Sequence, residues 1–293
     1  MKARRHEVHF LSGGISCAGW HYPAAGECCI VMGHGLGGIR ESGLAAYAER
    51  FAQAGFVCLV FDYRHFGDSQ GEPRQLGSIP RQLEDWRSAI QFARQLPGVR
   101  KVVLWGTSFS GGHVVVAASR DPEVAAVIAQ NPMLDGRSAF VQAAGRVGPW
   151  MVLRTVAVAL LDSFGALLGR LPRLLPVAAP PGSLGFLTAP DSLPGYLALS
   201  PAYARNELAA RLALTTASYR PIHCAHLVRC PVLLQICERD SVAPPAAALA
   251  TAQILGPRGR VESYPIGHFD IYFGDHFERA VGDQIHFLRH CLS

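Results

Sequence analysis

The chain has 293 residues, of which 49% are hydrophobic and only 17% are charged, so it can bury a large core and differs in composition from disordered proteins. Its 27 basic residues outnumber its 22 acidic ones, but they form no block of five or more like charges, and no nucleic-acid partner is indicated. The length fits one domain that carries an insertion. The low charge is compatible with an apolar binding site or with a homodimer contact.

The first part of the chain alternates strand-length apolar runs with segments of helical period, which predicts a mostly parallel α/β sheet. Residues 8–11 and 15–20 flank Ser12-Gly13-Gly14 and predict an antiparallel hairpin at the start. Further strands are predicted over 28–32, 56–61, 101–105 and 124–129, and helices over 42–54, 80–95 and 109–119. The core is therefore expected to be α/β.

This alternation stops near residue 135 and resumes near residue 228, with strands predicted over 231–236 and 261–264 and helices over 244–255 and 275–288. We predict that residues 1–134 and 228–293 form the core. Residues 135–227, rich in Pro and Leu, are expected to form a helical cap that supplies an apolar pocket. The apolar spacing over 154–175 is expected to reflect packing of this cap on the core, in preference to a membrane-binding face.

The compartment is predicted from what the chain lacks. The most hydrophobic stretch, 151–190, is interrupted by Arg154, Asp162, Arg170 and Arg173, so no membrane span is expected. The basic N-terminus is not followed by the apolar run of a signal peptide, and the eight cysteines form no C-x-x-C pair. These features predict a cytoplasmic protein with reduced thiols.

The strongest chemical motif is Gly106-Thr107-Ser108-Phe109-Ser110, between a predicted strand and a predicted helix. It has the form of a nucleophile elbow, in which a tight turn needs small residues two positions before and two after the nucleophile. Ser110 departs from the usual glycine but is still small. Ser108 is therefore the candidate nucleophile, and the backbone N–H of Phe109 is a candidate oxyanion donor.

A glycine-rich loop, Gly33-His34-Gly35-Leu36-Gly37-Gly38, follows the strand predicted over 28–32. With Asp62 it also satisfies a dinucleotide-binding pattern, but a hairpin precedes this strand, whereas such a fingerprint usually follows the first strand. We favour the other interpretation, in which the Leu36 N–H is the second oxyanion donor.

Two further loops follow predicted strands and carry Asp240 and His268. The order Ser108, Asp240, His268 is the Ser…Asp…His order of a catalytic triad on an α/β sheet, in which the acid orients the histidine and the histidine takes the serine proton. Three other carboxylates are candidates for the acid that orients His268: Asp135, Glu238 and Asp270. Asp135 is the main rival because it also follows a predicted strand.

These stretches, together with Phe61-Asp-Tyr-Arg-His-Phe-Gly-Asp-Ser69, resemble the α/β-hydrolase superfamily. The chain is similar to its serine aminopeptidase-like, X-Pro-peptidase-like and dienelactone-hydrolase-like esterases over most of residues 1–131 and 228–293. That branch often has glycine where this chain has His65, so His65 is expected to line the substrate site. His34 is a second candidate for substrate binding, while Asp62 and Arg64 are expected to shape a loop.

The predicted function is that of a serine hydrolase acting through an acyl-enzyme on an ester, or secondarily a thioester or amide, of a small, largely apolar molecule. No cofactor and no metal is expected; the cluster around Cys224, with His223, His226 and Cys230, lacks a metal-binding motif. Three alternatives stay open: an acyltransferase or cyclase of the same fold, an NAD(P)-dependent oxidoreductase, and a non-catalytic binding protein.

Overall fold

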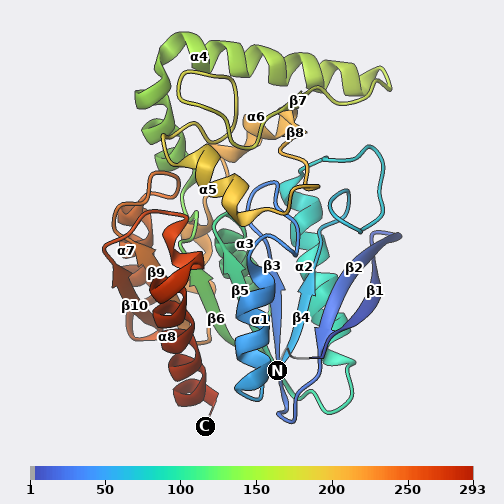
Figure 1. Cartoon of the computed structure of the whole chain (residues 1–293), viewed down its shortest axis with the longest axis vertical. Coiled ribbons are helices and arrows are strands. Elements are labelled where there is room, and N and C mark those ends of the chain that lie inside the picture. The colour runs from blue at the N-terminus through green and yellow to red at the C-terminus, as the bar shows by residue number, and fades with distance from the viewer. Residues whose placement is uncertain (1–3, 293) are drawn as a thin grey trace.

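The computed structural model describes residues 4–292, and within them eight strands form one sheet in the order β1-β2-β4-β3-β5-β6-β9-β10 (Figure 1). The strands are β1 (His6–Ser12), β2 (Ile15–Tyr22), β3 (Cys28–Gly33), β4 (Val57–Phe61), β5 (Lys101–Thr107), β6 (Val124–Gln130), β9 (Val232–Cys237) and β10 (Gly259–Tyr264). β1 pairs antiparallel with β2, and β2 pairs antiparallel with β4. From β4 to β10 every pairing is parallel.

Helices cover both faces of the sheet (Figure 1). One face packs on α1 (Leu44–Gln53) and α8 (Gly274–Leu292). The other face packs on α2 (Ile79–Arg94), α3 (Phe109–Arg120) and α7 (Pro245–Leu255). All residues of β3, β4 and β9 are buried, because strands between two helical layers have no solvent face. The predicted fold, including the N-terminal antiparallel hairpin, is confirmed.

Between β6 and β9 the chain leaves the sheet and lies over the edge at which the parallel strands end (Figure 1). This segment contains α4 (Gly136–Leu167), β7 (Leu174–Leu175), α5 (Ser192–Leu199), β8 (Leu208–Ala209), η1 (Ala210–Leu212), α6 (Ala213–Thr216) and η2 (Pro221–Leu227). Most of its helical residues belong to α4. The predicted helical insertion is therefore confirmed, and the part of it outside the helices is largely irregular.

The helix α4 is made of two halves. Gly148 interrupts it with φ 77°, and Pro149 follows. The first half is capped by the Asp135 carboxylate, which accepts hydrogen bonds from the N–H groups of Arg137 and Ser138. On the second half, the buried Asp162 carboxylate accepts hydrogen bonds from the N–H groups of Arg173 and Arg211, which lie outside the helix.

The prediction that the apolar residues of 154–175 pack on the core is wrong for most of them. Leu160, Phe164 and Leu171 are more than half exposed. The buried charged group on this half is Asp162, whose carboxylate pairs with Arg211 at 2.7 Å.

Among the described helices, α4 alone is long and apolar enough to cross a membrane. This test uses only length and composition, and core helices of other proteins pass it as well.

Candidate active site

The turn between β5 and α3 has the geometry of a nucleophile elbow. Ser108 has φ 55° and ψ −119°, and its N–H donates to the Gln130 carbonyl at 2.9 Å. A side chain at Gly106 would lie 2.3 Å from the Ser110 carbonyl oxygen, so only glycine fits there. The Ser110 hydroxyl is buried but lies 2.5 Å from the Tyr63 hydroxyl, which explains why serine is accepted at that position.

The structure brings Ser108, His268 and Asp240 together. His268 Nε2 lies 3.1 Å from Ser108 Oγ, and His268 Nδ1 lies 2.6 Å from Asp240 Oδ2. Asp240 Oδ1 accepts the N–H groups of Val242 and Ala243, each at 2.7 Å, so its carboxylate is fixed on both oxygens. With Nδ1 protonated toward Asp240, Nε2 is free to accept the Ser108 proton.

The rival acids lie elsewhere. Asp135 caps α4 and forms an ion pair with Arg220 at 2.9 Å. Glu238 is exposed, and Asp270 accepts the Gly267 N–H at 2.8 Å. Asp240 is therefore the carboxylate that bonds the histidine.

The loop after β3 approaches the serine closely. A side chain at Gly35 would lie 3.1 Å from Ser108 Cβ, and one at Gly37, where φ is 64°, would meet Val177 at 2.3 Å. Among residues 4–292 no backbone acceptor bonds the N–H of Leu36 or Phe109. The Phe109 N–H also belongs to the first residue of α3, where the helix dipole favours negative charge.

Asn131 supports the site, and the sequence analysis did not identify it. Its φ is 35°, its Nδ2 donates to the His268 carbonyl at 2.8 Å, and its Oδ1 accepts from Thr107 Oγ1 at 2.8 Å. Thr107 also contacts the Tyr272 hydroxyl. Asn131 thus ties the serine turn to the histidine loop. The signal was a short polar residue directly after a strand, where asparagine tolerates positive φ.

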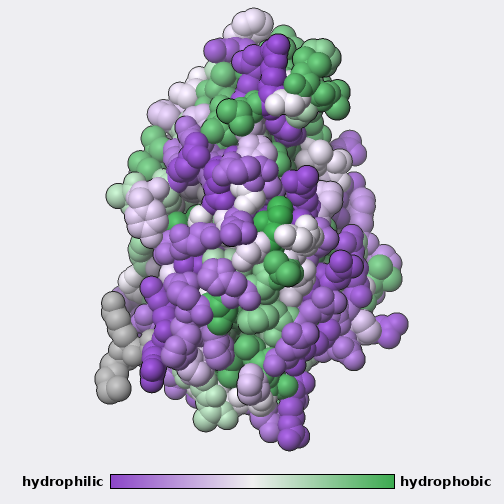
Figure 2. Space-filling model, turned by 90° about the vertical axis from the view of Figure 1, so that its right-hand side faces the viewer, coloured by the Kyte–Doolittle hydropathy of each residue, from purple (hydrophilic) through white to green (hydrophobic). Residues whose placement is uncertain are grey.

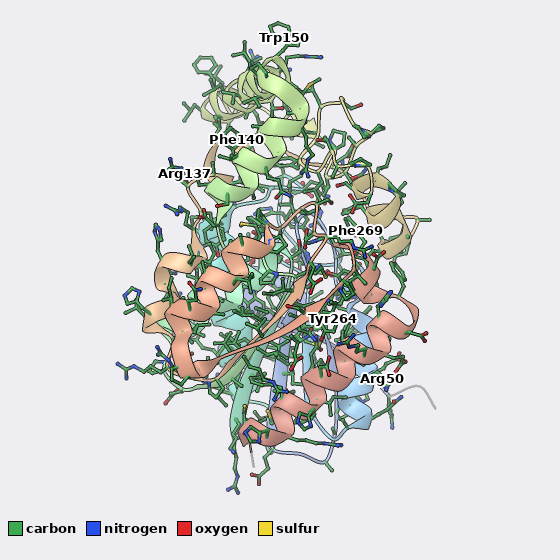
Figure 3. All side chains as sticks on the ribbon, turned by 90° about the vertical axis from the view of Figure 1, so that its left-hand side faces the viewer. Arg50, Arg137, Phe140, Trp150, Tyr264 and Phe269 are labelled. Atoms are coloured by element: carbon green, nitrogen blue, oxygen red, sulfur yellow. The ribbon has the colours of Figure 1, made fainter. Side chains whose placement is uncertain are left out.

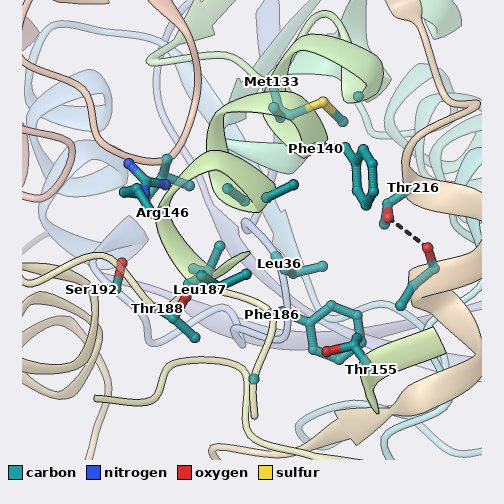
Figure 4. Close-up of a pocket in the computed structure, with 18 of the residues that line it drawn as sticks. Leu36, Met133, Phe140, Arg146, Thr155, Phe186, Leu187, Thr188, Ser192 and Thr216 are labelled. Carbon is teal, nitrogen blue, oxygen red and sulfur yellow. Dashed lines mark hydrogen bonds between the residues drawn. The ribbon is translucent and has the colours of Figure 1, made fainter. Parts of the chain in front are cut away.

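A cavity of about 180 Å³ adjoins Ser108 (Figure 4). Its wall includes residues of α4, such as Phe140 and Val156, and the loop with Phe186 and Leu187. In Figure 4, Thr155 of α4 lies beside Phe186. Arg146 contributes the one charged side chain among the described residues of its wall. A second cavity of about 30 Å³ lies between Ser108, the histidine loop with His268 and Phe269, and the glycine-rich loop after β3.

The candidate substrate-binding residues His34 and His65 line neither cavity. His34 packs edge-on against Tyr63 in the core, and its Nδ1 donates to the Gly35 carbonyl at 3.0 Å. His65 is buried with its Nε2 3.0 Å from Arg81 Nη1. Its φ of 74° explains why related chains have glycine there, and the structure corrects both predictions.

Asp62 and Arg64 hold the neighbouring loop, as expected. Asp62 accepts the N–H of Arg40 at 2.7 Å and that of Asp68 at 3.2 Å. Arg64 Nε donates to Asp85 at 2.6 Å. Because the Asp62 carboxylate is buried and bonded to the backbone, it is not available to a ribose hydroxyl, which argues against the dinucleotide interpretation.

Two histidines near the site are buried in the neutral form. Burial lowers the pKa of His34 to about 4 and that of His113 to about 3. His113 lies between the Tyr219 hydroxyl at 2.6 Å and Gln82 Oε1 at 3.1 Å, so the neutral ring is satisfied on both nitrogens. Protonation would place a positive charge in a site shut off from water, and this burial is the main cause of the lowered pKa of His113.

These depressed pKa values predict acid sensitivity. An unfolded histidine titrates near pH 6.5, so below that pH the unfolded chain binds more protons and the free energy of unfolding falls as the pH drops toward the folded values. In urea unfolding, the loss from pH 7 to pH 5 should be about 2 kcal/mol smaller in His113→Gln than in the wild type. The exposed His226→Gln is the control, and an unchanged loss in His113→Gln would contradict this origin.

The comparisons with known proteins agree with this fold. The model of the alpha/beta hydrolase fold family matches residues 29–275. The quorum-quenching protein AidA of Acinetobacter baumannii is 44% identical over 97% of this chain and 94% of its own. The thiohydrolase aneE of Aspergillus aculeatus is 36% identical over 44% of this chain and 42% of its own.

Solved structures show the same architecture. The α/β hydrolase GrgF from Penicillium sp. superposes with a TM-score of 0.82 at 25% identity, over 99% of this chain and all of its own. A complex of DcsB with its substrate analogue gives 0.83 at 25% identity, over 98% of this chain and 99% of its own. With the family match over residues 29–275, the order of the sheet and the relatives named as hydrolases, this chain belongs to the α/β-hydrolase family and is a hydrolase.

Proposed function

We propose that the protein is a serine hydrolase that cleaves an ester of a small, largely apolar molecule through an acyl-enzyme. The observation that carries this proposal is the continuous hydrogen-bonded series Asp240, His268, Ser108, with Ser108 at the wall of an apolar cavity. A serine in this setting attacks acyl carbons.

In the first half of the reaction, Ser108 Oγ bonds to the carbonyl carbon while His268 Nε2 takes the hydroxyl proton. The N–H groups of Leu36 and Phe109 receive the oxyanion. The C–O bond to the leaving group then breaks, and His268 returns its proton to the leaving oxygen. In the second half, water attacks the acyl carbon while His268 takes the water proton. The bond from the acyl carbon to Ser108 Oγ then breaks, His268 returns the proton to Oγ, and the acid leaves.

The two cavities beside Ser108 support a substrate with one bulky apolar part and one small part. A cavity needs roughly 10–15 Å³ to hold one water, so the smaller one accommodates about two or three heavy atoms. The larger cavity is several times this size and mostly apolar. The kinship to a quorum-quenching protein supports a small signal molecule as the substrate.

Three esters test the proposal: methyl octanoate, octyl acetate and octyl octanoate, with acid release followed in a pH-stat. One of the first two should be hydrolysed at least about tenfold faster than octyl octanoate, because the small cavity excludes a second long chain. The faster of the two shows which side of the ester enters the large cavity. Equal rates for all three esters would contradict the two-cavity substrate.

The large cavity also makes a prediction for Val156, which lines it from α4. Val156→Trp should lower kcat/KM by at least about tenfold for the faster of methyl octanoate and octyl acetate, and it should change ethyl acetate hydrolysis little, because only the bulky part loses its space. Val141→Trp, on an exposed part of α4 outside this cavity, is the matched control. An equal loss with both esters in Val156→Trp would contradict the assignment.

Acyl transfer is a second candidate, favoured by the likeness to polyketide transferase grgF of Penicillium sp., 26% identical over 99% of this chain and 97% of its own. The acyl-enzyme would be the same, and an alcohol would replace water. Product analysis with methanol added to the assay of octyl acetate or octyl octanoate separates the two, because transfer of the acyl group to methanol then gives a new ester. A methyl ester that forms in preference to the acid at low methanol concentration favours transfer.

A further inference from the structure

The second half of α4 and the turn after it present a row of apolar side chains to solvent. We call this row the outer stripe; its members, each between 54% and 83% exposed, are Trp150, Leu153, Leu160, Leu161, Phe164, Leu167, Leu168 and Leu171. Within α4, which ends at Leu167, spacings of three, four and seven residues place the members on one side of the helix, and Leu168 and Leu171 continue the row in the turn after it. Soluble monomers rarely leave a continuous apolar surface of this kind uncovered.

The exposed charges of the segment that carries the outer stripe have one sign. Residues 136–173 include five arginines and a single acidic residue, Asp162. Asp162 is buried and bonded to the Arg211 guanidinium, so its charge is compensated inside the protein. Arg154 lies within the stripe and Arg170 at its end, both exposed. The exposed charge of this segment is therefore entirely positive.

The outer stripe lies at one extreme end of the molecule. In Figure 3, Trp150 is at the outermost tip and points away from the body. Figure 2 shows apolar residues gathered at the same end, beside hydrophilic ones. The helix that carries the stripe also supplies Val152, Thr155 and Val156 to the wall of the active-site cavity. One helix thus separates the cavity from the exterior.

We propose that the outer stripe docks the protein on an anionic phospholipid surface, with α4 lying in the plane of the interface. Leucine, tryptophan and phenylalanine side chains enter the boundary between head groups and acyl chains, and arginines bind anionic head groups. A second copy of the chain is the other occupant to consider. Two stripes packed together would place Arg154 and Arg170 among further arginines, and this segment offers no exposed carboxylate to pair with them.

Trp150 is a built-in probe of this docking. It is 68% exposed, whereas Trp20, Trp86 and Trp105 are buried. Vesicles of phosphatidylcholine with a minority of phosphatidylglycerol should shift the emission to shorter wavelength and protect it from acrylamide. Pure phosphatidylcholine vesicles should do so far less, and salt should weaken the effect. Trp150→Phe should remove the signal while the protein still sediments with the anionic vesicles.

Two double variants separate the apolar and the ionic contributions. Leu160→Ser with Phe164→Ser, and Arg154→Glu with Arg170→Glu, should each weaken sedimentation with anionic vesicles on the order of tenfold or more. The matched control is Leu249→Ser with Ile254→Ser, on the exposed side of α7, which should bind as the wild type does. Hydrolysis of a water-soluble ester should be unchanged in the Leu160 and Phe164 variant, because neither residue lines the cavity.

Three results would overturn the proposal. The first is an unshifted Trp150 emission with anionic vesicles, and the second is equal binding to neutral and anionic vesicles. The third is a dimer in sedimentation equilibrium that Leu160→Ser with Phe164→Ser dissociates, because that result would give the outer stripe to a second copy. None of these measurements depends on the ester substrate proposed above.

Discussion

Replacing Ser108 with alanine is expected to lower kcat by roughly 10⁴-fold or more while the protein stays folded. Ser108 Oγ is the atom that would form the acyl-enzyme, and it lies 3.1 Å from His268 Nε2. Alanine has no oxygen to attack the substrate and no hydroxyl proton to give to His268. Alanine also removes no buried hydrogen bond to the core other than this one, so stability should change little. Steady-state kinetics, with the faster of methyl octanoate and octyl acetate, measure the first effect, and urea unfolding measures the second.

A second serine in the same cavity provides the control. Ser192 lines the cavity and is buried, and its hydroxyl has no hydrogen-bond partner among the described residues. Ser192→Ala should keep kcat within a few-fold of the wild type, because no described residue accepts a hydrogen bond from the Ser192 hydroxyl to activate it. A fluorophosphonate probe should label the wild type and the Ser192 variant but not Ser108→Ala. A folded Ser108→Ala protein with full activity would disprove the mechanism.

Replacing Asp240 with asparagine is expected to lower kcat by roughly 10⁴-fold, as an amide in this position holds the histidine in the wrong tautomer. The asparagine oxygen could accept the N–H groups of Val242 and Ala243, so its amide nitrogen would face His268 Nδ1. Nδ1 would then accept a hydrogen bond and Nε2 would carry the proton. Such a ring cannot take the Ser108 proton.

Asp135→Asn is the matched comparison for this acid. It weakens the ion pair with Arg220 and leaves a capping residue in place, so a loss of stability of about 1 kcal/mol and a nearly normal kcat are expected. Both variants should be measured side by side with the same ester. If kcat falls by orders of magnitude in Asp135→Asn and stays close to the wild-type value in Asp240→Asn, the acid is Asp135.

The sheet and the three central side chains could be predicted from the sequence because their signals are local. Strands such as β3 and β9 are apolar throughout, since both faces are covered, and small residues must surround Ser108 at so tight a turn. The carboxyl ends of parallel strands share one edge of a sheet. The loops of Asp240 and His268 were therefore expected at the serine without any knowledge of distances.

The features that the sequence did not predict depend on contacts between distant segments. Periodicity identified an apolar side on α4, but it does not say whether protein or solvent covers that side, and the structure leaves Phe164 exposed. His65 was expected in the substrate site because it replaces a glycine, whereas its ring turns toward Arg81. The cavity wall joins Phe140 to Phe186, and no short-range pattern links residues that far apart.

The separation between the reacting groups and the cavity wall has a consequence for how this protein can change. The proposed reacting groups all lie outside the segment between β6 and β9, which supplies most of the cavity wall. They belong to Leu36, Ser108, Phe109, Asp240 and His268. Apart from Asn131, which ties the serine turn to the histidine loop, residues of that segment can therefore be changed to alter which substrates fit the cavity while the proposed reacting groups stay in place. For directed evolution, the segment is the part to randomise, and libraries confined to it should retain a far larger share of active variants than libraries spread over the whole chain.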